Sequence, residues 1–162
     1  MSVSIDRLRD LFDVDAEAGV IRWRASGIRA KAGAIAGGLS GRGYCYVGVD
    51  GLKLKVHRIV FALVHGYWPV CVDHINGIKT DNRPENLRDA THAENMRNSK
   101  LRKDNTSGFK GVTWDARAAK WQAQAHINGR CKFLGYFTEA SEAAEVAARF
   151  RSQHHMEFAR HV

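Results

Sequence analysis

The sequence has little continuous hydrophobicity. Its longest uninterrupted apolar run covers residues 59–64, far short of the roughly 18 residues that a membrane-spanning helix needs. The polar start, residues 1–10, lacks the apolar region of a secretory signal. We therefore expect a cytoplasmic protein with no membrane contact.

Paired cysteines are also missing. The three cysteines, Cys45, Cys71 and Cys131, include no CxxC pair. An odd and scattered set argues against a disulfide framework and against a four-ligand zinc site. We expect reduced thiols and no structural zinc.

Negative charge is in short supply as well. The chain of 162 residues has 25 Lys and Arg against 17 Asp and Glu, a net charge of +8. Residues 1–19 carry a net −3, so the remainder carries +11. Such an excess points to a polyanionic partner such as nucleic acid, although it could also serve solubility alone.

Local patterns predict a mixed first half. Residues 5–12 have the apolar spacing of a helix, and residues 18–23 read as a strand after a glycine turn. Asp50-Gly51 between two alternating segments, 44–49 and 52–56, is typical of a tight β-hairpin. Two further segments complete this half: a glycine-rich loop at 33–43, close to something large or plain linker, and a helix at 57–65.

The second half predicts a small sheet with one helix. Polar, basic residues 98–107 read as a connection, which gives domains 1–99 and 107–162 with a linker at 100–106. Strands are expected at 111–115, 121–127 and 132–137, with a turn at Asn128-Gly129. Thr138 then caps an alanine-rich helix to about residue 155, whose face consists of Ala143, Ala147 and Phe150. The expected fold class is α+β.

Residues 70–98 hold more polar side chains than a connecting loop needs. A strand at 70–72 would deliver Asp73 and His74, and a return strand at 87–90 would follow a loop. Thr91 and Glu94 form a capping box, so a helix begins there. These elements can bring together four polar residues: Asp73, His74, Asn86 and Asn95.

This set could bind a divalent metal ion and activate a water molecule. Magnesium prefers oxygen ligands and takes few from protein, which the Asp73 carboxylate and the Asn95 amide could supply. His74 has a side chain suited to taking a proton from water, and Asn86 could orient its ring. Taken singly, each residue is more simply a turn residue or a surface histidine.

The segments DHINGIKTDNRPENL, with EN downstream, and VHRIVFALVHGYWP resemble the HNH homing-endonuclease family, in the variant that ends in Asn. The resemblance covers nearly all of residues 1–99. It implies a ββα-metal nuclease with one divalent metal, Mg or Mn, bound by Asp73 and Asn95, with His74 as general base and Asn86 positioning it. The products would be 5′-phosphate and 3′-hydroxyl ends.

Three further residues of this half stay open. His57 matches a recurrent family position and either takes part in the site or packs near it as a helix-start residue. Arg83 and Arg88 flank the site, where they would hold phosphate or be solvated surface residues.

Residues 107–160, with KGV, KW, LG and the alanine-rich helix, resemble the APETALA-type DNA-binding domain of plant ethylene-response factors. The resemblance implies a three-stranded sheet that enters the major groove. Alternation directs Ala123, Ala125 and Ile127 toward the helix. The plant face is rich in Arg, whereas this chain offers other groups, which could equally be solvent-exposed surface. The candidate DNA-contacting residues are Lys110, Thr113, Gln122, Gln124, His126, Arg130 and Lys132.

Two functions are compatible with the sequence. The first is a metal-dependent, homing-type endonuclease of double-stranded DNA, a monomer or a DNA-bound dimer in a bacterial or phage-infected cell, targeted by its C-terminal domain. The second is a DNA-binding regulator with a vestigial nuclease half. The intact set of four polar residues favours the first.

Overall fold

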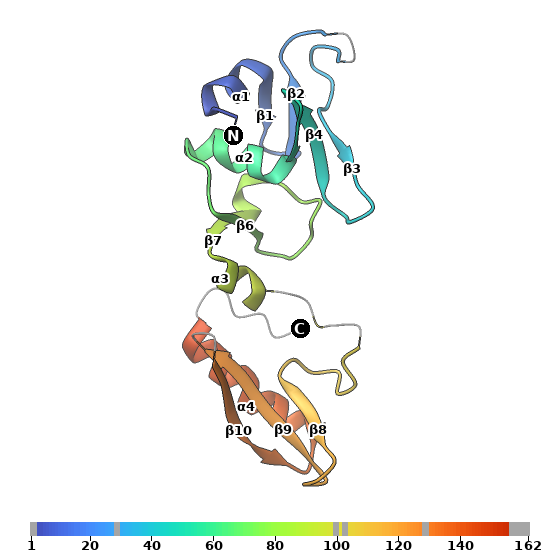
Figure 1. The fold of residues 1–162 in the computed structure, drawn as a ribbon, viewed down its shortest axis with the longest axis vertical. Coiled ribbons are helices and arrows are strands. Elements are labelled where there is room, and N and C mark those ends of the chain that lie inside the picture. The colour runs from blue at the N-terminus through green and yellow to red at the C-terminus, as the bar shows by residue number, and fades with distance from the viewer. Residues whose placement is uncertain (1–2, 28–29, 99–100, 102–103, 128–129, 156–162) are drawn as a thin grey trace. The chain divides into compact units, whose positions relative to one another are not determined.

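The computed structural model describes residues 3–27, 30–98, 101, 104–127 and 130–155. Its chain forms two compact units, unit 1 (Met1–His92) and unit 2 (Ala93–Val162). The division lies ahead of the expected linker at 100–106, and the domain limits themselves stay a prediction. Figure 1 shows the elements of each unit.

Unit 1 begins with a short helix and a hairpin. Helix α1 (Ile5–Leu11) starts at Ser4, whose Oγ accepts a hydrogen bond from the Arg7 backbone N–H at 3.2 Å. Strands β1 (Phe12–Asp15) and β2 (Val20–Trp23) pair antiparallel. The expected strand is confirmed as β2, whereas β1 was not expected, and residue 12 begins this strand instead of ending the helix.

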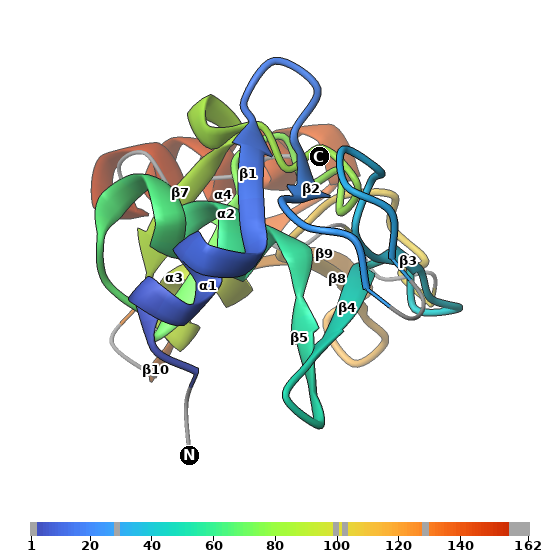
Figure 2. The same ribbon diagram turned by 90° about the horizontal axis from the view of Figure 1, so that it is seen from above.

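A second sheet has the order β3-β4-β5, with β3 at Gly38–Leu39, β4 at Cys45–Val49 and β5 at Leu52–Lys55. Asp50 and Gly51 have φ angles of 47° and 80°, which confirms the tight turn expected of this pair. Figure 2 shows β4 and β5 as a twisted hairpin with β3 beside β4. The glycine-rich segment therefore contains a short strand as well as loop.

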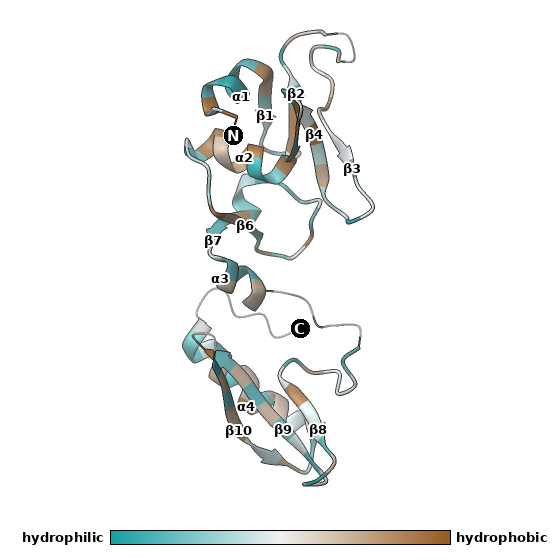
Figure 3. Ribbon diagram, viewed as in Figure 1, coloured by the Kyte–Doolittle hydropathy of each residue, from teal (hydrophilic) through white to brown (hydrophobic). Residues whose placement is uncertain are grey.

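Helix α2 (Val56–His65) is the centre of the unit 1 core and ends at Gly66, which adopts the left-handed conformation. It contacts α1, β2, β4 and β5 as well as the two strands that follow it in the chain. Ile59 and Val60 on this helix are fully buried, as are Leu8 and Ile21. Figure 3 shows the hydrophobic positions of β2 and β4.

The last part of unit 1 is the antiparallel pair β6 (Cys71–His74) and β7 (Leu87–Ala90), with the 3₁₀ turn η1 (Pro84–Asn86) before β7. Both expected strands are confirmed. Helix α3 (His92–Arg97) follows Thr91, as the capping box predicts.

Unit 2 is a three-stranded antiparallel sheet with one helix, as expected. The order is β10-β9-β8, with β8 at Val112–Asp115, β9 at Lys120–Ile127 and β10 at Arg130–Phe137. Helix α4 (Ala140–His155) packs on the sheet through Ala143 and Ala147, which meet Val112 and Ala123. The fold class is therefore α+β. The expected turn at Asn128-Gly129 lies outside the described residues.

Within the described part of the chain, no helix combines the length and apolar character needed to cross a membrane.

Candidate active site

Strand β6 carries Asp73 and His74 as neighbouring residues, both buried, with 4% and 5% of their surface exposed. We expected them just beyond a strand, whereas both lie within it. Direct pairing with β7 sets Asp73 opposite Arg88 and His74 opposite Leu87. The antiparallel pairing of the two strands therefore fixes the backbone of Asp73 and His74.

Arg88 forms the ion pair of Asp73. Its Nε and Nη2 donate to the Asp73 Oδ2 at 2.9 and 2.8 Å, and both side chains are largely removed from solvent. Burying a carboxylate without a partner is costly, so the ion pair with Arg88 offsets the cost of burying Asp73. Arg88 is thus not a solvated surface residue, and phosphate binding at this residue stays a prediction.

The His74 ring is held by Asn82. The ring Nε2 lies 3.1 Å from the Asn82 Oδ1, and both residues are buried. An amide oxygen only accepts, so Nε2 carries the proton and Nδ1 is the nitrogen able to accept one. Burial lowers the pKa of His74, against the opposing effects of Asn82 and Asp73. The neutral imidazole that a general base requires is therefore favoured.

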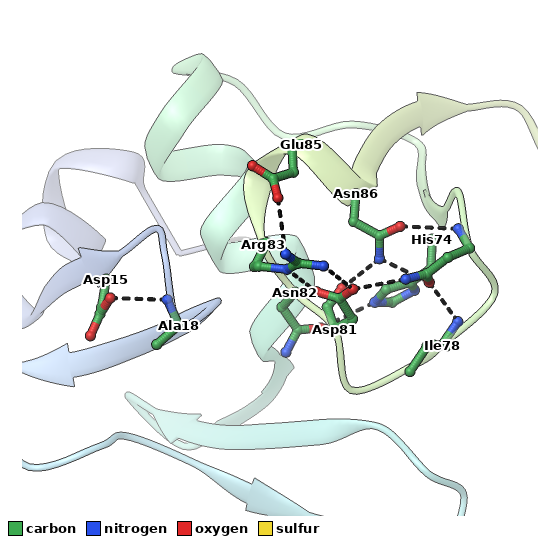
Figure 4. A network of polar contacts seen from close by, with 10 residues as sticks. Asp15, Ala18, His74, Ile78, Asp81, Asn82, Arg83, Glu85 and Asn86 are labelled. Atoms are coloured by element: carbon green, nitrogen blue, oxygen red, sulfur yellow. Dashed lines mark hydrogen bonds and ion pairs between the residues drawn. The ribbon is translucent and has the colours of Figure 1, made fainter.

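Asn86 stabilises the loop between the strands. Its Nδ2 donates to the Asp81 carbonyl oxygen at 2.7 Å and to the Asn76 Oδ1 at 3.0 Å, and its Oδ1 accepts from the Asn76 backbone N–H. Figure 4 shows this network beside His74. We expected Asn86 to orient the imidazole, but the structure gives that contact to Asn82. The sequence places both asparagines in the same loop, so residue type alone could not distinguish them.

Asp81 and Arg83 form a second charged pair in this loop. The Arg83 guanidinium donates to both Asp81 carboxylate oxygens, at 2.8 and 2.9 Å, and also pairs with Glu85 at 3.1 Å. Arg83 holds the pKa of Asp81 well below its usual range, aided by Asn76. Arg83 stays partly exposed, so phosphate binding at this residue remains a prediction.

The rings of His57 and Tyr44 lie close to the His74 ring. The His57 ring centroid is 4.8 Å from that of His74, edge-on, and Tyr44 lies 5.3 Å from His57 and 6.1 Å from His74. His57 is 3% exposed, and burial lowers its pKa to about 3. It is therefore neutral and packed against the general-base candidate. Tyr44 was not singled out from the sequence, because a tyrosine before a strand carries no distinctive signal.

Asn95 belongs to α3, which lies in unit 2 apart from its first residue. Its approach to Asp73 therefore stays a prediction. Among the described residues, no group of three or more His, Cys, Asp or Glu is placed to hold a metal ion. A carboxylate with one amide oxygen is nevertheless a chemically suitable donor set for Mg²⁺, which keeps most of its water ligands.

In unit 2 the outer face of the sheet carries the expected polar residues. Register pairs Gln122 with Thr113, and Gln124 with Phe133. Ala123 and Ala125 are buried on the helix side, as alternation predicts. Phe133 and Tyr136 also occupy the outer face, both exposed, with ring centroids 5.0 Å apart.

The other candidate DNA-contacting residues of unit 2 do not all lie on the outer face of the sheet. His126 and Arg130 are exposed near the described ends of β9 and β10. Lys132 pairs with Ala125, and its Nζ lies 5.6 Å from the ring centroid of Phe150 on α4. Lys132 therefore lies on the helix side of the sheet and not on the outer face. Lys110 precedes β8 and its carbonyl oxygen accepts from Arg151.

Comparison with known proteins agrees with the site. A sequence model described as HNH endonuclease matches residues 54–97. Protein 3.8 of Escherichia phage T7 is 34% identical over 98 residues, covering 59% of this chain and 75% of that protein. The chain belongs to the HNH endonuclease family. The matched residues 54–97 include Asp73, His74, Asn82 and Asn86. No solved structure matches the chain.

Members of the HNH family generally use a divalent metal, in agreement with the oxygen donors near His74. The family match ends at residue 97. The resemblance of residues 107–160 to the APETALA-type domain therefore stays a prediction.

Proposed function

We propose that this HNH-family protein is a divalent-metal-dependent endonuclease of double-stranded DNA. The observation that carries the proposal is the neutral His74 ring, buried beside Asp73 and held through Nε2 by Asn82. Nδ1 is then the atom that takes a proton from the attacking water. Asn82 keeps the ring in one tautomer, and the His57 ring packs against it edge-on.

Asp73 and Asn95 would hold the single metal ion, with Mg²⁺ or Mn²⁺ as the candidates. When bound, such an ion stabilises the charge on the phosphate and on the leaving 3′ oxygen, which yields 5′-phosphate and 3′-hydroxyl ends. Arg88 fixes the direction of the Asp73 carboxylate through two hydrogen bonds. Asn86 keeps the loop that carries Asn82 in place.

We further propose that unit 2 directs the nuclease to its site, as in a homing endonuclease. Supporting features are the polar outer face around Gln122 and Gln124 and the exposed ring pair Phe133 and Tyr136. Glutamine can form two hydrogen bonds with adenine in the major groove, and the exposed rings can contact sugars or thymine methyl groups.

Incubation of supercoiled plasmid with the protein, with Mg²⁺, Mn²⁺ or a chelator, tests the nuclease proposal. Nicked or linear product should form only with metal, and end-labelling should find 5′-phosphates. A protein that binds plasmid but leaves it intact with either metal would contradict the proposal and favour a DNA-binding regulator. Counting nicked against linear product also shows whether one strand or both are cut.

A further inference from the structure

The sheet β3-β4-β5 has one face in the core and one face in solvent. Val47 and Leu54 pair directly across β4 and β5 and pack into the core. The neighbouring pairs, Tyr46 with Lys55 and Gly48 with Lys53, therefore project to the other side. Side chains alternate along an extended chain, so Tyr44, two residues before Tyr46, projects to the same side of the sheet.

Lysine ammonium groups lie over the tyrosine rings of this face. The Lys53 Nζ is 4.8 Å from the Tyr46 ring centroid, and the Lys55 Nζ is 4.5 Å from that of Tyr44. Lys79, from the loop after β6, adds a third ammonium group, 4.7 Å from the Tyr44 ring. We name the surface made by Tyr44, Tyr46, Lys53, Lys55 and Lys79 the lysine–tyrosine face.

The positive charge of this face is not neutralised within the described part of unit 1. Lys53, Lys55 and Lys79 form no ion pair with any described residue, whereas six arginines of the unit pair with carboxylates. Residues 18–72 contain eight Lys or Arg and one acid, Asp50. Asp50 lies in the hairpin turn, and its carboxylate forms an ion pair with the Arg7 guanidinium at 3.0 Å.

The backbone of this face is also open. A Cβ atom added at Gly38 or at Gly48 would meet no atom within 4 Å, so a large ligand can approach the strands closely there. The face continues to the active site, because the Tyr44 ring lies 6.1 Å from the His74 ring.

We propose that the lysine–tyrosine face binds the backbone of the DNA duplex beside the phosphate at the His74 site. The lysines neutralise phosphates, and the glycines let the duplex lie close to the sheet. Tyr44 holds Lys55 and Lys79 near His74, so that phosphate binding and proton transfer occur at adjoining positions. The inference rests on the proposed nuclease function, and it adds a DNA-binding surface in unit 1 that is separate from the sheet of unit 2.

Binding without cleavage tests this proposal. The full-length triple variant Lys53→Gln/Lys55→Gln/Lys79→Gln is compared with the wild type on a random-sequence duplex, with chelator present, at several salt concentrations. We expect affinity to fall roughly tenfold or more and the slope of log affinity against log salt to shrink by about 0.9 per lysine, or about 2.7 in total.

The matched control removes the same charge elsewhere in unit 1. The triple variant Arg7→Gln/Arg9→Gln/Arg24→Gln replaces exposed arginines that are already ion-paired, so its slope should stay close to that of the wild type. Equal slopes for the two triple variants would overturn the proposal, even if metal-dependent cleavage is confirmed. Failure to cleave would instead contradict the nuclease function without affecting this result.

A second pair of variants separates charge from folding. Gly48→Glu adds a carboxylate to the open face, and Gly48→Gln adds a neutral side chain of the same size. The glutamate variant should bind duplex several-fold more weakly than the glutamine variant, with both equally stable to heat. Equal duplex affinity for the two variants would also overturn the proposal. So would a glutamate variant that binds phosphatidylserine vesicles more weakly than the glutamine variant but binds DNA equally well.

Discussion

At the scale of single residues, the ion pair between Asp73 and Arg88 bears on both folding stability and the proposed metal site. The carboxylate is buried and receives two donors from one guanidinium. Removing one partner of such a pair leaves an uncompensated charge, which costs more than the pair itself contributes.

Asp73→Ala should therefore lower the free energy of unfolding by about 3 kcal/mol and abolish metal-dependent cleavage, with poor rescue by added Mg²⁺. Asp73→Ala/Arg88→Met should recover part of the stability and none of the activity. Urea denaturation of the single and double variants measures the first effect. A double variant no more stable than Asp73→Ala would show that Arg88 does not need the carboxylate.

His57 should make folding stability depend on pH. Its pKa falls from 6.5 to about 3 on folding, because burial disfavours the charged ring. The unfolded chain thus binds more protons between these values, and stability is full above pH 6.5 and declines as the pH falls toward 3. The slope from this one group approaches about 1.4 kcal/mol per pH unit.

His57→Gln should flatten that decline when unfolding is measured by urea denaturation from neutral to mildly acid pH. His65→Gln is the control, because it removes an exposed histidine of the same helix and leaves His57 buried. Identical pH profiles for the wild type and His57→Gln would refute the assignment.

Among the structural elements, the loop between β6 and β7 depends on Asn86. Asn86→Asp keeps the acceptor for the Asn76 N–H but loses both donated hydrogen bonds. We expect a loss of about 1 to 3 kcal/mol of stability, since two hydrogen bonds are lost and the new carboxylate oxygen faces two acceptor oxygens. Asn82→Ala, which removes the contact to His74, should cost less stability and shift the pH profile of cleavage. The reverse pattern would restore the orienting role to Asn86.

Strand β9 is the second element that a substitution can test. Gln122→Ala and Gln124→Ala should each reduce the preference for a selected target over random duplex by about 1 to 3 kcal/mol, with little change in salt slope. Gln153→Ala, an exposed glutamine of α4, is the matched control. Unchanged target preference in the β9 variants would remove the outer face from sequence recognition.

Elements with strong local signals could be predicted from sequence. Asp50-Gly51 indicated a hairpin, alternation in β9 separated Ala123 and Ala125 from the glutamines, and the capping box marked the start of α3. Strand β1 was missed because Phe12 continues the helical spacing of residues 5–12, and the alternation of FDVD covers only four residues. Strand β3 was missed because its two residues are held only by pairing with β4.

The candidate site was predictable in residue types but not in contacts. The pairing of Asp73 with Arg88 depends on the register of β6 and β7, and the long loop between them leaves that register open in the sequence. The choice of Asn82 over Asn86 at the imidazole depends on where that loop turns, which is settled by packing.

Over the molecule as a whole, charge is distributed unevenly. Residues 1–19 are acidic, while residues 18–72 and 100–162 are both basic, the latter with 11 Lys and Arg against 6 acids. Both units thus have the means to bind phosphate, and only unit 1 carries the Asp73 and His74 pair. We therefore propose that unit 1 supplies the general base and the metal-binding carboxylate, and we expect DNA binding to be shared between the two units.

The proposed role of His74 as general base underlies the whole assignment of metal-dependent DNA cleavage. Its sharpest test is the single-turnover cleavage rate of His74→Ala against the wild type on the same duplex in Mg²⁺, with affinity measured in parallel. We predict a rate lower by about 10² to 10⁴-fold at nearly unchanged affinity, because a general base acts on the reaction and contributes little to binding. A variant that cuts at the wild-type rate would contradict this role.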